Sequence, residues 1–261
     1  MPVCLTIAGS DPSGGAGAQA DLATFAALGA RGASVLTAVT AQNTTGVLGV
    51  FALPAAWVAA QIDAVFDDLD VAAVKVGMLG NLGNVEAVAE RLAARRPAHV
   101  VLDPVLSAAG GEPLLGEDAI GRLIEALFPL ATLVTPNLPE AARLAGRELP
   151  EDPEAAARAV LDLGARAVLL KGGHRDGADV VDELVSREGP SRRFSHPRAP
   201  GPPAHGTGCA LSSAVTAGLA GGLGLADAVG KAIFHVEGAL RAAFPVGKGS
   251  LVLDPFWRRR I

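Results

Sequence analysis

The sequence predicts an α/β fold, a three-layer αβα sandwich around a mostly parallel central sheet. Short apolar runs of strand length alternate with longer runs of helical period along the chain. This alternation is typical of a parallel sheet whose two faces are covered by helices. Because the sequence contains no internal repeat and no segment with the composition of a linker, we expect one domain over residues 1–261.

Composition and charge exclude several classes of protein. Half of the residues are hydrophobic and 19% are charged, which argues against global disorder. The net charge is −5, so we expect no nucleic-acid partner. The apolar runs are interrupted before they reach membrane-spanning length, and no signal peptide is evident, so we expect no membrane partner. Two cysteines form no disulfide framework and favour reduced thiols in a cytoplasmic protein.

The elements of the first two thirds follow from apolar periodicity and from glycine and proline. Residues 3–8 predict a buried strand, and the helix after it has Leu22 and Phe25 on one face and ends at Gly29. Residues 34–40 predict the next strand, and Pro54 begins the next helix. Further strands are expected at 72–76, 98–102, 131–134 and 165–170, with helices between them at 82–94, 118–127, 140–144 and 153–163.

The last third of the chain departs from this alternation. Residues 180–185 and 192–196 could pair as a β-hairpin around Glu188 and Gly189. Two helices follow, the first over 207–219. The second carries one apolar face, formed by Val229, Ile233, Val236 and Leu240.

Glycines and polar residues follow the predicted strands at their carboxyl ends, which is where ligands bind in open parallel sheets. The sequence therefore predicts a functional site at this edge of the sheet. The segments concerned are 9–17, 41–44, 77–78, 103–104, 135–137 and 171–174.

The glycine-rich segment 9–17 has two interpretations. It lacks the Gly-Lys-Ser/Thr of a phosphate-binding P-loop and the spacing of a dinucleotide fingerprint. Glycines also serve any tight turn into a helix, so the loop could be purely structural. Asp21, one helical turn further on, could cap the helix locally or reach a ligand.

The segment His205-Gly206-Thr207-Gly208-Cys209 lies at a predicted helix start, where exposed N–H groups and the helix dipole favour an anion. A cysteine in the first turn is expected to have a lowered pKa and could act as base or nucleophile. Position alone, however, favours the alternative of a small buried cysteine at a helix entry.

Three charged residues could serve phosphate chemistry. Asp103 ends an apolar strand and could hold Mg²⁺, as could Glu140. Asn137 and Glu140 also fit a helix cap and its partner three residues later, which is the more common use of this pattern. Lys171 follows a strand and could contact a phosphate or simply end the strand at the surface.

Taken together, these motifs resemble the hydroxymethylpyrimidine/phosphomethylpyrimidine kinase family of the ribokinase-like superfamily. Each motif is weak alone, but their order and spacing are specific and extend over nearly the whole chain. The matching segments are TIAGSDPSGGAG (6–17), QAD (19–21), AQNT (41–44), KVGML (75–79), LDPV (102–105), TPNLPEA (135–141), KGGH (171–174) and HGTGC (205–209).

The resemblance implies a ribokinase-like phosphotransferase that uses ATP and Mg²⁺. It would phosphorylate hydroxymethylpyrimidine to the monophosphate and then to the pyrophosphate, in thiamine biosynthesis. A homodimer is also implied, with the segment 36–50 as one candidate contact. The implied pyrimidine pocket, in which Gln42 hydrogen-bonds the ring edge, consists of Gly9, Asp21, Gln42, Met78 and Val105.

The resemblance also assigns roles at the phosphate end. Asp103 and Glu140 would organise Mg²⁺, and Cys209 would be the base that deprotonates the substrate hydroxyl. Contacts to ATP phosphates would come from Asn137, Lys171 and Thr207, and N–H groups for the transferring phosphoryl from Gly206, Gly208 and Cys209.

Two segments depart from the family pattern. Relatives often carry Lys-Ser-Gly where this chain has Ala109-Gly110-Gly111, so a lysine contact to phosphate is absent or supplied elsewhere. Segment 108–111 is also the candidate lid. Relatives often have Asn-Thr before the motif at His205, where this chain has Pro202-Pro203-Ala204.

Two other functions fit the same residues. A pyridoxal/pyridoxine kinase would also phosphorylate a hydroxymethyl group on an aromatic nitrogen ring. A non-catalytic pyrimidine-binding protein is a different class, but it would have no need of Asp103, Glu140, Lys171 and Cys209.

Overall fold

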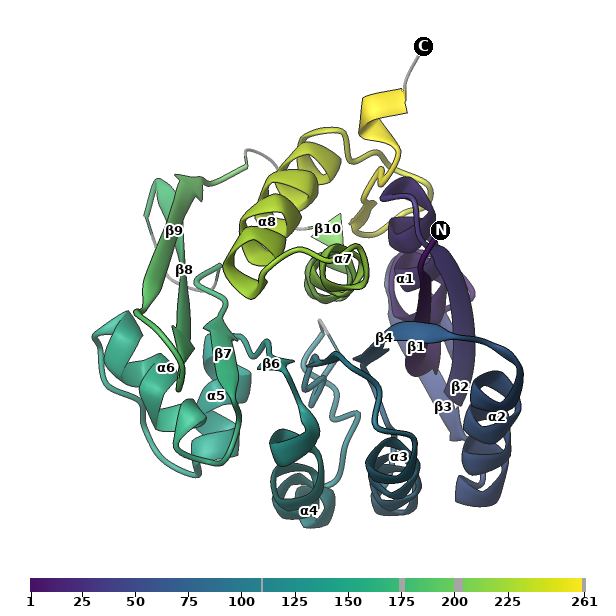
Figure 1. Ribbon diagram of the computed structural model, residues 1–261. Helices are drawn as coiled ribbons and strands as arrows, with labels where there is room; N and C mark the ends of the chain where they lie inside the picture. Colours follow the sequence, from purple (N-terminus) through teal and green to yellow (C-terminus); the bar gives the residue numbers. More distant parts are fainter. Residues whose placement is uncertain (109, 174–176, 200–203, 260–261) are drawn as a thin grey trace.

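The computed structural model describes residues 1–108, 110–173, 177–199 and 204–259 (Figure 1). Within these residues, nine strands form one sheet in the order β3-β2-β1-β4-β5-β6-β7-β8-β9. Strands from β2 to β7 pair in parallel, whereas β3, β8 and β9 add antiparallel edges. Their bounds are β1 (Val3–Ser10), β2 (Arg31–Asn43), β3 (Gly46–Ala52), β4 (Val71–Val76), β5 (Val100–Leu102), β6 (Leu133–Val134), β7 (Ala167–Leu170), β8 (Asp179–Ser186) and β9 (Arg192–Pro197).

Helices cover both faces of the sheet, which confirms the predicted three-layer sandwich (Figure 1). On one face lie α1 (Gly17–Ala27), α7 (Thr207–Ala220) and α8 (Leu225–Arg241). The opposite face is covered by α2 (Ala55–Asp68), α3 (Leu82–Arg95), α4 (Glu117–Leu127), α5 (Leu138–Ala145) and α6 (Pro153–Leu161). None of the described helices is long and apolar enough to cross a membrane.

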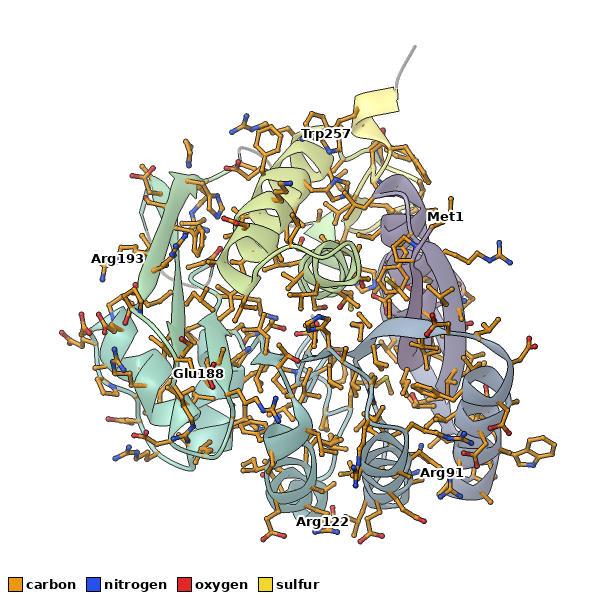
Figure 2. The ribbon with its side chains drawn as sticks, in the orientation of Figure 1. Met1, Arg91, Arg122, Glu188, Arg193 and Trp257 are labelled. Carbon is orange, nitrogen blue, oxygen red and sulfur yellow. The ribbon has the colours of Figure 1, made fainter. Side chains whose placement is uncertain are left out.

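Successive residues of the central strands belong to different cores, because side chains alternate across a strand. Leu102 and Val134 pack toward the α2–α6 layer, while their neighbours Val101 and Leu133 pack toward α7 and α8. All four are buried, which explains why these strands are continuous apolar runs in the sequence. Charged side chains lie at the outside, as Figure 2 shows for the arginine labelled on α4, Arg122.

Segment 36–50 contains more strand than the predicted residues 34–40. Strand β2 continues to Asn43, and β3 returns antiparallel to it as an edge strand. The pattern of β3 is hard to detect in sequence, since it contains two glycines, and Leu48 and Phe51 are 80% and 67% exposed. The predicted hairpin is confirmed as β8 and β9.

A second, two-stranded sheet was missed because its strands are only two residues long. Strand β10 (Ala204–His205) pairs in parallel with β11 (Leu251–Val252). This small sheet holds His205 directly before α7 and beside the loop that follows β1.

The order of strands creates a switch point beside β1. Chain order leads from β1 to β2 and β3 on one side, and the next strand, β4, pairs with the other side of β1. Connections diverge at such a point and leave a crevice at the carboxyl ends of the strands. The segments after β1 and β4, which begin at Asp11 and Gly77, therefore border this crevice.

Candidate active site

A cavity of about 1050 Å³ opens at the carboxyl ends of the parallel strands. Its walls come from the segments after β1, β4, β5, β6 and β7 and from the start of α7, and residues of β2, β3, β8, β9 and α8 also line it. The structure thus brings together segments that were predicted to meet at this edge. The predicted site residues that line the cavity are Gly9, Gln42, Met78, Asp103, Val105, Asn137, Glu140, Lys171, Gly206, Thr207, Gly208 and Cys209.

Asp21 is the exception, and its predicted position in the pocket wall is corrected. Its side chain is fully buried behind the cavity, where it forms an ion pair with Lys75 Nζ at 2.9 Å. It also accepts hydrogen bonds from Thr6 Oγ1 (2.6 Å) and Ser213 Oγ (2.7 Å). The spacing in the sequence placed Asp21 one turn into the helix but could not show that this turn faces the sheet. Lys75, by contrast, does line the cavity.

Asn137 and Glu140 serve as helix cap and as cavity wall at once. The Asn137 side chain accepts from the Glu140 N–H (2.9 Å), and the Glu140 carboxylate accepts from the Asn137 N–H (2.8 Å). This capping box starts α5 at Leu138, two residues before the predicted start. The cap fixes the Glu140 carboxylate at the cavity, so the structural and the functional interpretations are compatible.

Lys171 lies between the two carboxylates of the site. Its Nζ is 2.9 Å from Asp103 Oδ1 and 3.8 Å from Glu140 Oε2. Asp103 also accepts from Thr135 Oγ1 at 3.2 Å, so the carboxylate is held from two strand ends. Gly208 lies against this pair, and a Cβ on it would lie 3.1 Å from Lys171 Nζ.

The two carboxyl groups differ in acidity. Burial opposes ionisation of Asp103, but the charges of Lys171 and Lys75 outweigh it and hold its pKa below the usual range. Burial dominates at Glu140 and raises its pKa, although Lys171 acts in the opposite direction. The site therefore combines one firmly ionised carboxylate with one that gains a proton more easily.

The donor set fits Mg²⁺. Two carboxylates converge on one cation, Lys171, and oxygen ligands are those that Mg²⁺ prefers. No cluster of three or more His, Cys, Asp or Glu side chains suited to a metal occurs among the described residues. Mg²⁺ commonly takes one or two carboxylates and completes its shell with waters and substrate phosphates. Asp103 and Glu140 are sufficient for that kind of site.

The start of α7 faces the same cavity. Gly206 is its N-cap with φ +81°, and the first N–H groups of a helix have no partner within the helix. A Cβ on Gly206 would lie 1.9 Å from the Gly15 carbonyl oxygen, so glycine is required for the contact between this helix start and the loop after β1. The arrangement is suited to binding an anion.

The thiol of Cys209 differs from expectation. Burial raises its pKa to about 11, and the negative charges of Asp21 and Asp103 add to this. The positive charge of Lys75 acts in the opposite direction but does not compensate. Reasoning from the helix N-terminus alone predicted a lowered pKa and omitted the desolvation of the thiol.

We expect iodoacetamide to alkylate Cys209 slowly near pH 7 and faster as the pH approaches about 11, because the thiolate is the nucleophile. Mass spectrometry of the labelled peptide measures the rate. Cys4 is fully buried, and labelling of the Cys209→Ala variant measures how much label Cys4 takes up. Rapid labelling of Cys209 at neutral pH would contradict the raised pKa.

Asp11, Lys75 and His205 are among the cavity residues that were assigned no role from the sequence. His205 Nε2 lies 3.2 Å from Asp11 Oδ2 and 2.7 Å from the Gln42 amide nitrogen. The available signals were a lone lysine in an apolar strand and the histidine that begins the HGTGC motif. The stretch at Ala109 and the residues before Ala204 lie partly outside the described residues.

Known proteins share these sequence features. A family model described as phosphomethylpyrimidine kinase matches residues 11–254. The chain is 48% identical over 250 residues to the hydroxymethylpyrimidine/phosphomethylpyrimidine kinase of Salmonella typhimurium, covering 94% of each protein. It is 49% identical over 247 residues to a thiamine biosynthesis bifunctional protein of Geobacter sulfurreducens, of which it spans 50%.

Solved structures share the fold. The pyridoxal kinase of Bacillus subtilis, determined as an ADP complex, superposes with a TM-score of 0.91 at 33% identity over all of both chains. Fold and cavity define a kinase of the ribokinase-like class. Within this class, the chain belongs to the phosphomethylpyrimidine kinase family.

Proposed function

We propose that the protein phosphorylates hydroxymethylpyrimidine with MgATP, and then phosphorylates the monophosphate to the pyrophosphate, as a step of thiamine biosynthesis. One observation carries the proposal. A single cavity joins Gly9, Gln42 and Met78 at one end to Asp103, Lys171 and the start of α7 at the other. A heterocycle and a triphosphate can thus meet in one cavity.

Four residues form the proposed pyrimidine pocket. Gly9 permits close approach, since a Cβ there would lie 2.9 Å from Met78 Sδ. Gln42 offers a side-chain amide to the ring edge, and Met78 and Val105 offer apolar surface. Asp21 contributes indirectly, by forming an ion pair with Lys75, which lines the cavity.

The phosphate end is proposed to bind the ATP phosphates through Asn137, Lys171 and Thr207. Gly206 and Gly208 would donate backbone N–H groups to the phosphoryl in transfer, a form of stabilisation that helix starts supply without reorganisation. Bound Mg²⁺, held by Asp103 and Glu140, would neutralise phosphate charge.

Cys209 is proposed as the general base that accepts the proton of the substrate hydroxyl. Its thiol lies in the first turn of α7 and lines the cavity. Burial lowers the pKa of Lys75, but the negative charges around it, that of Asp21 first, together raise it by more, so Lys75 stays charged. Its positive charge favours the thiolate of Cys209.

The second phosphorylation needs a cation for the phosphate already on the substrate. Arg143 lines the cavity and donates from Nη1 to Ser107 Oγ at 3.0 Å, close to the stretch in which relatives carry lysine. It is the candidate that replaces the missing lysine contact.

The alternative, a pyridoxal kinase, is favoured by the close superposition on the Bacillus subtilis enzyme. Sequence identity favours the pyrimidine kinase, at 48% against 33%. The two activities are separated by incubating the protein with MgATP and either hydroxymethylpyrimidine or pyridoxine and resolving the products by mass spectrometry over time.

Each outcome of this assay is informative. Monophosphate followed by pyrophosphate supports the full proposal, and monophosphate alone removes its second step. Turnover of pyridoxine without turnover of the pyrimidine moves the assignment to the alternative. Binding without any product leaves the non-catalytic function.

A cytoplasmic homodimer is part of the proposal, supported by two free thiols and by exposed apolar side chains on one edge. Leu48, Phe51 and Trp57 are 80%, 67% and 67% exposed on β3 and α2. We expect light scattering to give a dimer mass and Leu48→Asp with Phe51→Asp to shift it toward the monomer. A dimer unaffected by both substitutions would place the interface elsewhere.

A further inference from the structure

Three side chains from distant parts of the sequence form a line at the proposed pyrimidine pocket. His205, on β10, lies between Asp11 and Gln42, and all three line the cavity. His205 Nε2 is 3.2 Å from Asp11 Oδ2 and 2.7 Å from the Nε2 end of the Gln42 amide. The Oε1 end of that amide is 3.2 Å from Thr40 Oγ1.

Asp11 is a fixed anion. Its Oδ1 accepts from the N–H and the hydroxyl of Ser13 at 2.9 and 2.8 Å, and its Oδ2 accepts from the Ala16 N–H at 2.8 Å. Burial opposes ionisation, but these bonds and that of His205 hold the pKa of Asp11 below its usual range. A carboxylate only accepts, so the nitrogen beside it, His205 Nε2, carries a proton.

Thr40 restricts the other end of the amide. Its hydroxyl has a single proton, which it donates to the Ser10 carbonyl oxygen at 2.8 Å, and a carbonyl oxygen can only accept. Thr40 Oγ1 can therefore only accept from Gln42. The two ends of a glutamine amide have the same shape and opposite hydrogen-bond character, so neighbours such as these decide its orientation.

Both neighbours demand the same orientation. With the amino group toward His205, two N–H donors would face each other at 2.7 Å. With the amide reversed, the carbonyl oxygen of Gln42 and Asp11 Oδ2 share the single Nε2 proton of His205, and the amino group donates to Thr40 Oγ1. Every donor in the line then has an acceptor.

We propose that His205, whose Nε2 is kept protonated by Asp11, shares this proton with the Gln42 amide and so fixes the amide with its oxygen toward His205 and its amino group toward Thr40. This deepens the proposed function and rests on it. An amide amino group has two hydrogens, so one remains for the ligand. The pocket then selects heterocycles that present a ring nitrogen with a lone pair at this edge, and His205 is a positioning residue for that selection.

The effect on recognition is tested with His205→Phe, which removes the donor, and His205→Gln, which restores an N–H. We expect His205→Phe to raise the KM for hydroxymethylpyrimidine, and its Kd by calorimetry without ATP, about tenfold, because one buried hydrogen bond is lost. The kcat is expected to change much less and the KM for ATP not at all. His205→Gln should recover most of the affinity.

Two results would overturn the proposal in this assay, provided that thermal melting shows both variants to be folded. One is unchanged affinity in His205→Phe, and the other is an equal loss in both variants. If the wild-type protein neither binds nor phosphorylates the pyrimidine, the proposed function fails instead, and the hydrogen-bond network is tested separately.

That separate test uses the ligand-free, ¹⁵N-labelled protein. We expect NMR to show a proton on His205 Nε2, with the resonance assigned by its loss in His205→Gln. The Gln42 amino hydrogens should show cross-relaxation to the Thr40 side chain rather than to the His205 ring. An unprotonated Nε2 that accepts from the Gln42 amino group would refute the proposed orientation.

Discussion

Replacing Cys209 with alanine is expected to lower kcat by about 10²- to 10⁴-fold, the contribution typical of a positioned general base. The thiol lines the cavity in the first turn of α7, next to the N–H groups proposed to hold the phosphoryl. A base of high pKa is strong but scarcely ionised near neutral pH, so the activity of the wild-type protein should also rise with pH. Steady-state rates of pyrimidine phosphorylation across pH measure both effects.

Cys4 is the matched control, because it is the second thiol of the chain and lies fully buried against Phe25, away from the cavity. Cys4→Ala should retain kcat and its pH dependence. If Cys209→Ala kept activity within about threefold of the wild type, a base worth at least a hundredfold would be excluded.

Replacing Lys75 with methionine is expected to lower the free energy of unfolding by about 3–5 kcal/mol, because it leaves a buried carboxylate without its partner. Lys75 and Asp21 are both fully buried, and their nearest charged atoms are 2.9 Å apart. Two hydroxyl donors to Asp21, from Thr6 and Ser213, remain but carry no charge. Urea denaturation followed by circular dichroism gives the free energy.

The double variant Asp21→Leu with Lys75→Met separates the cost of an unpaired buried carboxylate from the cost of altered packing. Replacing both members of a buried pair by apolar residues is often neutral, so the double variant should be more stable than Lys75→Met alone. A loss under about 1 kcal/mol in Lys75→Met would mean that Asp21 takes up a proton at little cost or is reached by water.

The sequence was sufficient to predict the strands that are covered on both faces by other elements. Strands such as β1 and β7 were predicted close to their observed bounds, because both of their faces are covered and every residue is apolar or small. Strand β3 was missed because an exposed edge strand requires no apolar period. Strands β10 and β11 were missed because two residues carry no period at all.

Contacts between residues that follow parallel strands could be anticipated from the sequence, whereas contacts that the strand order does not imply were missed. Lys171 and Asp103 each follow a strand, and parallel strands bring such ends together. The direction of Asp21 and the pKa of Cys209 depend on burial, which position in the sequence does not give. The contact between Asp11 and His205 joins residues 194 positions apart, and spacing within the chain contains no sign of it.

The late position of α7 in the chain determines when activity can appear during synthesis. It covers β1 and β4 and supplies Ser213 to Asp21, yet it follows all nine strands of the main sheet in the chain. A growing chain therefore exposes the Asp21–Lys75 pair until α7 (Thr207–Ala220) has emerged from the ribosome. The same helix start closes the phosphate end of the cavity. The active site is thus completed at the same step that covers the core beneath α7. Chains truncated before α7 are expected to be both inactive and easily digested by proteases.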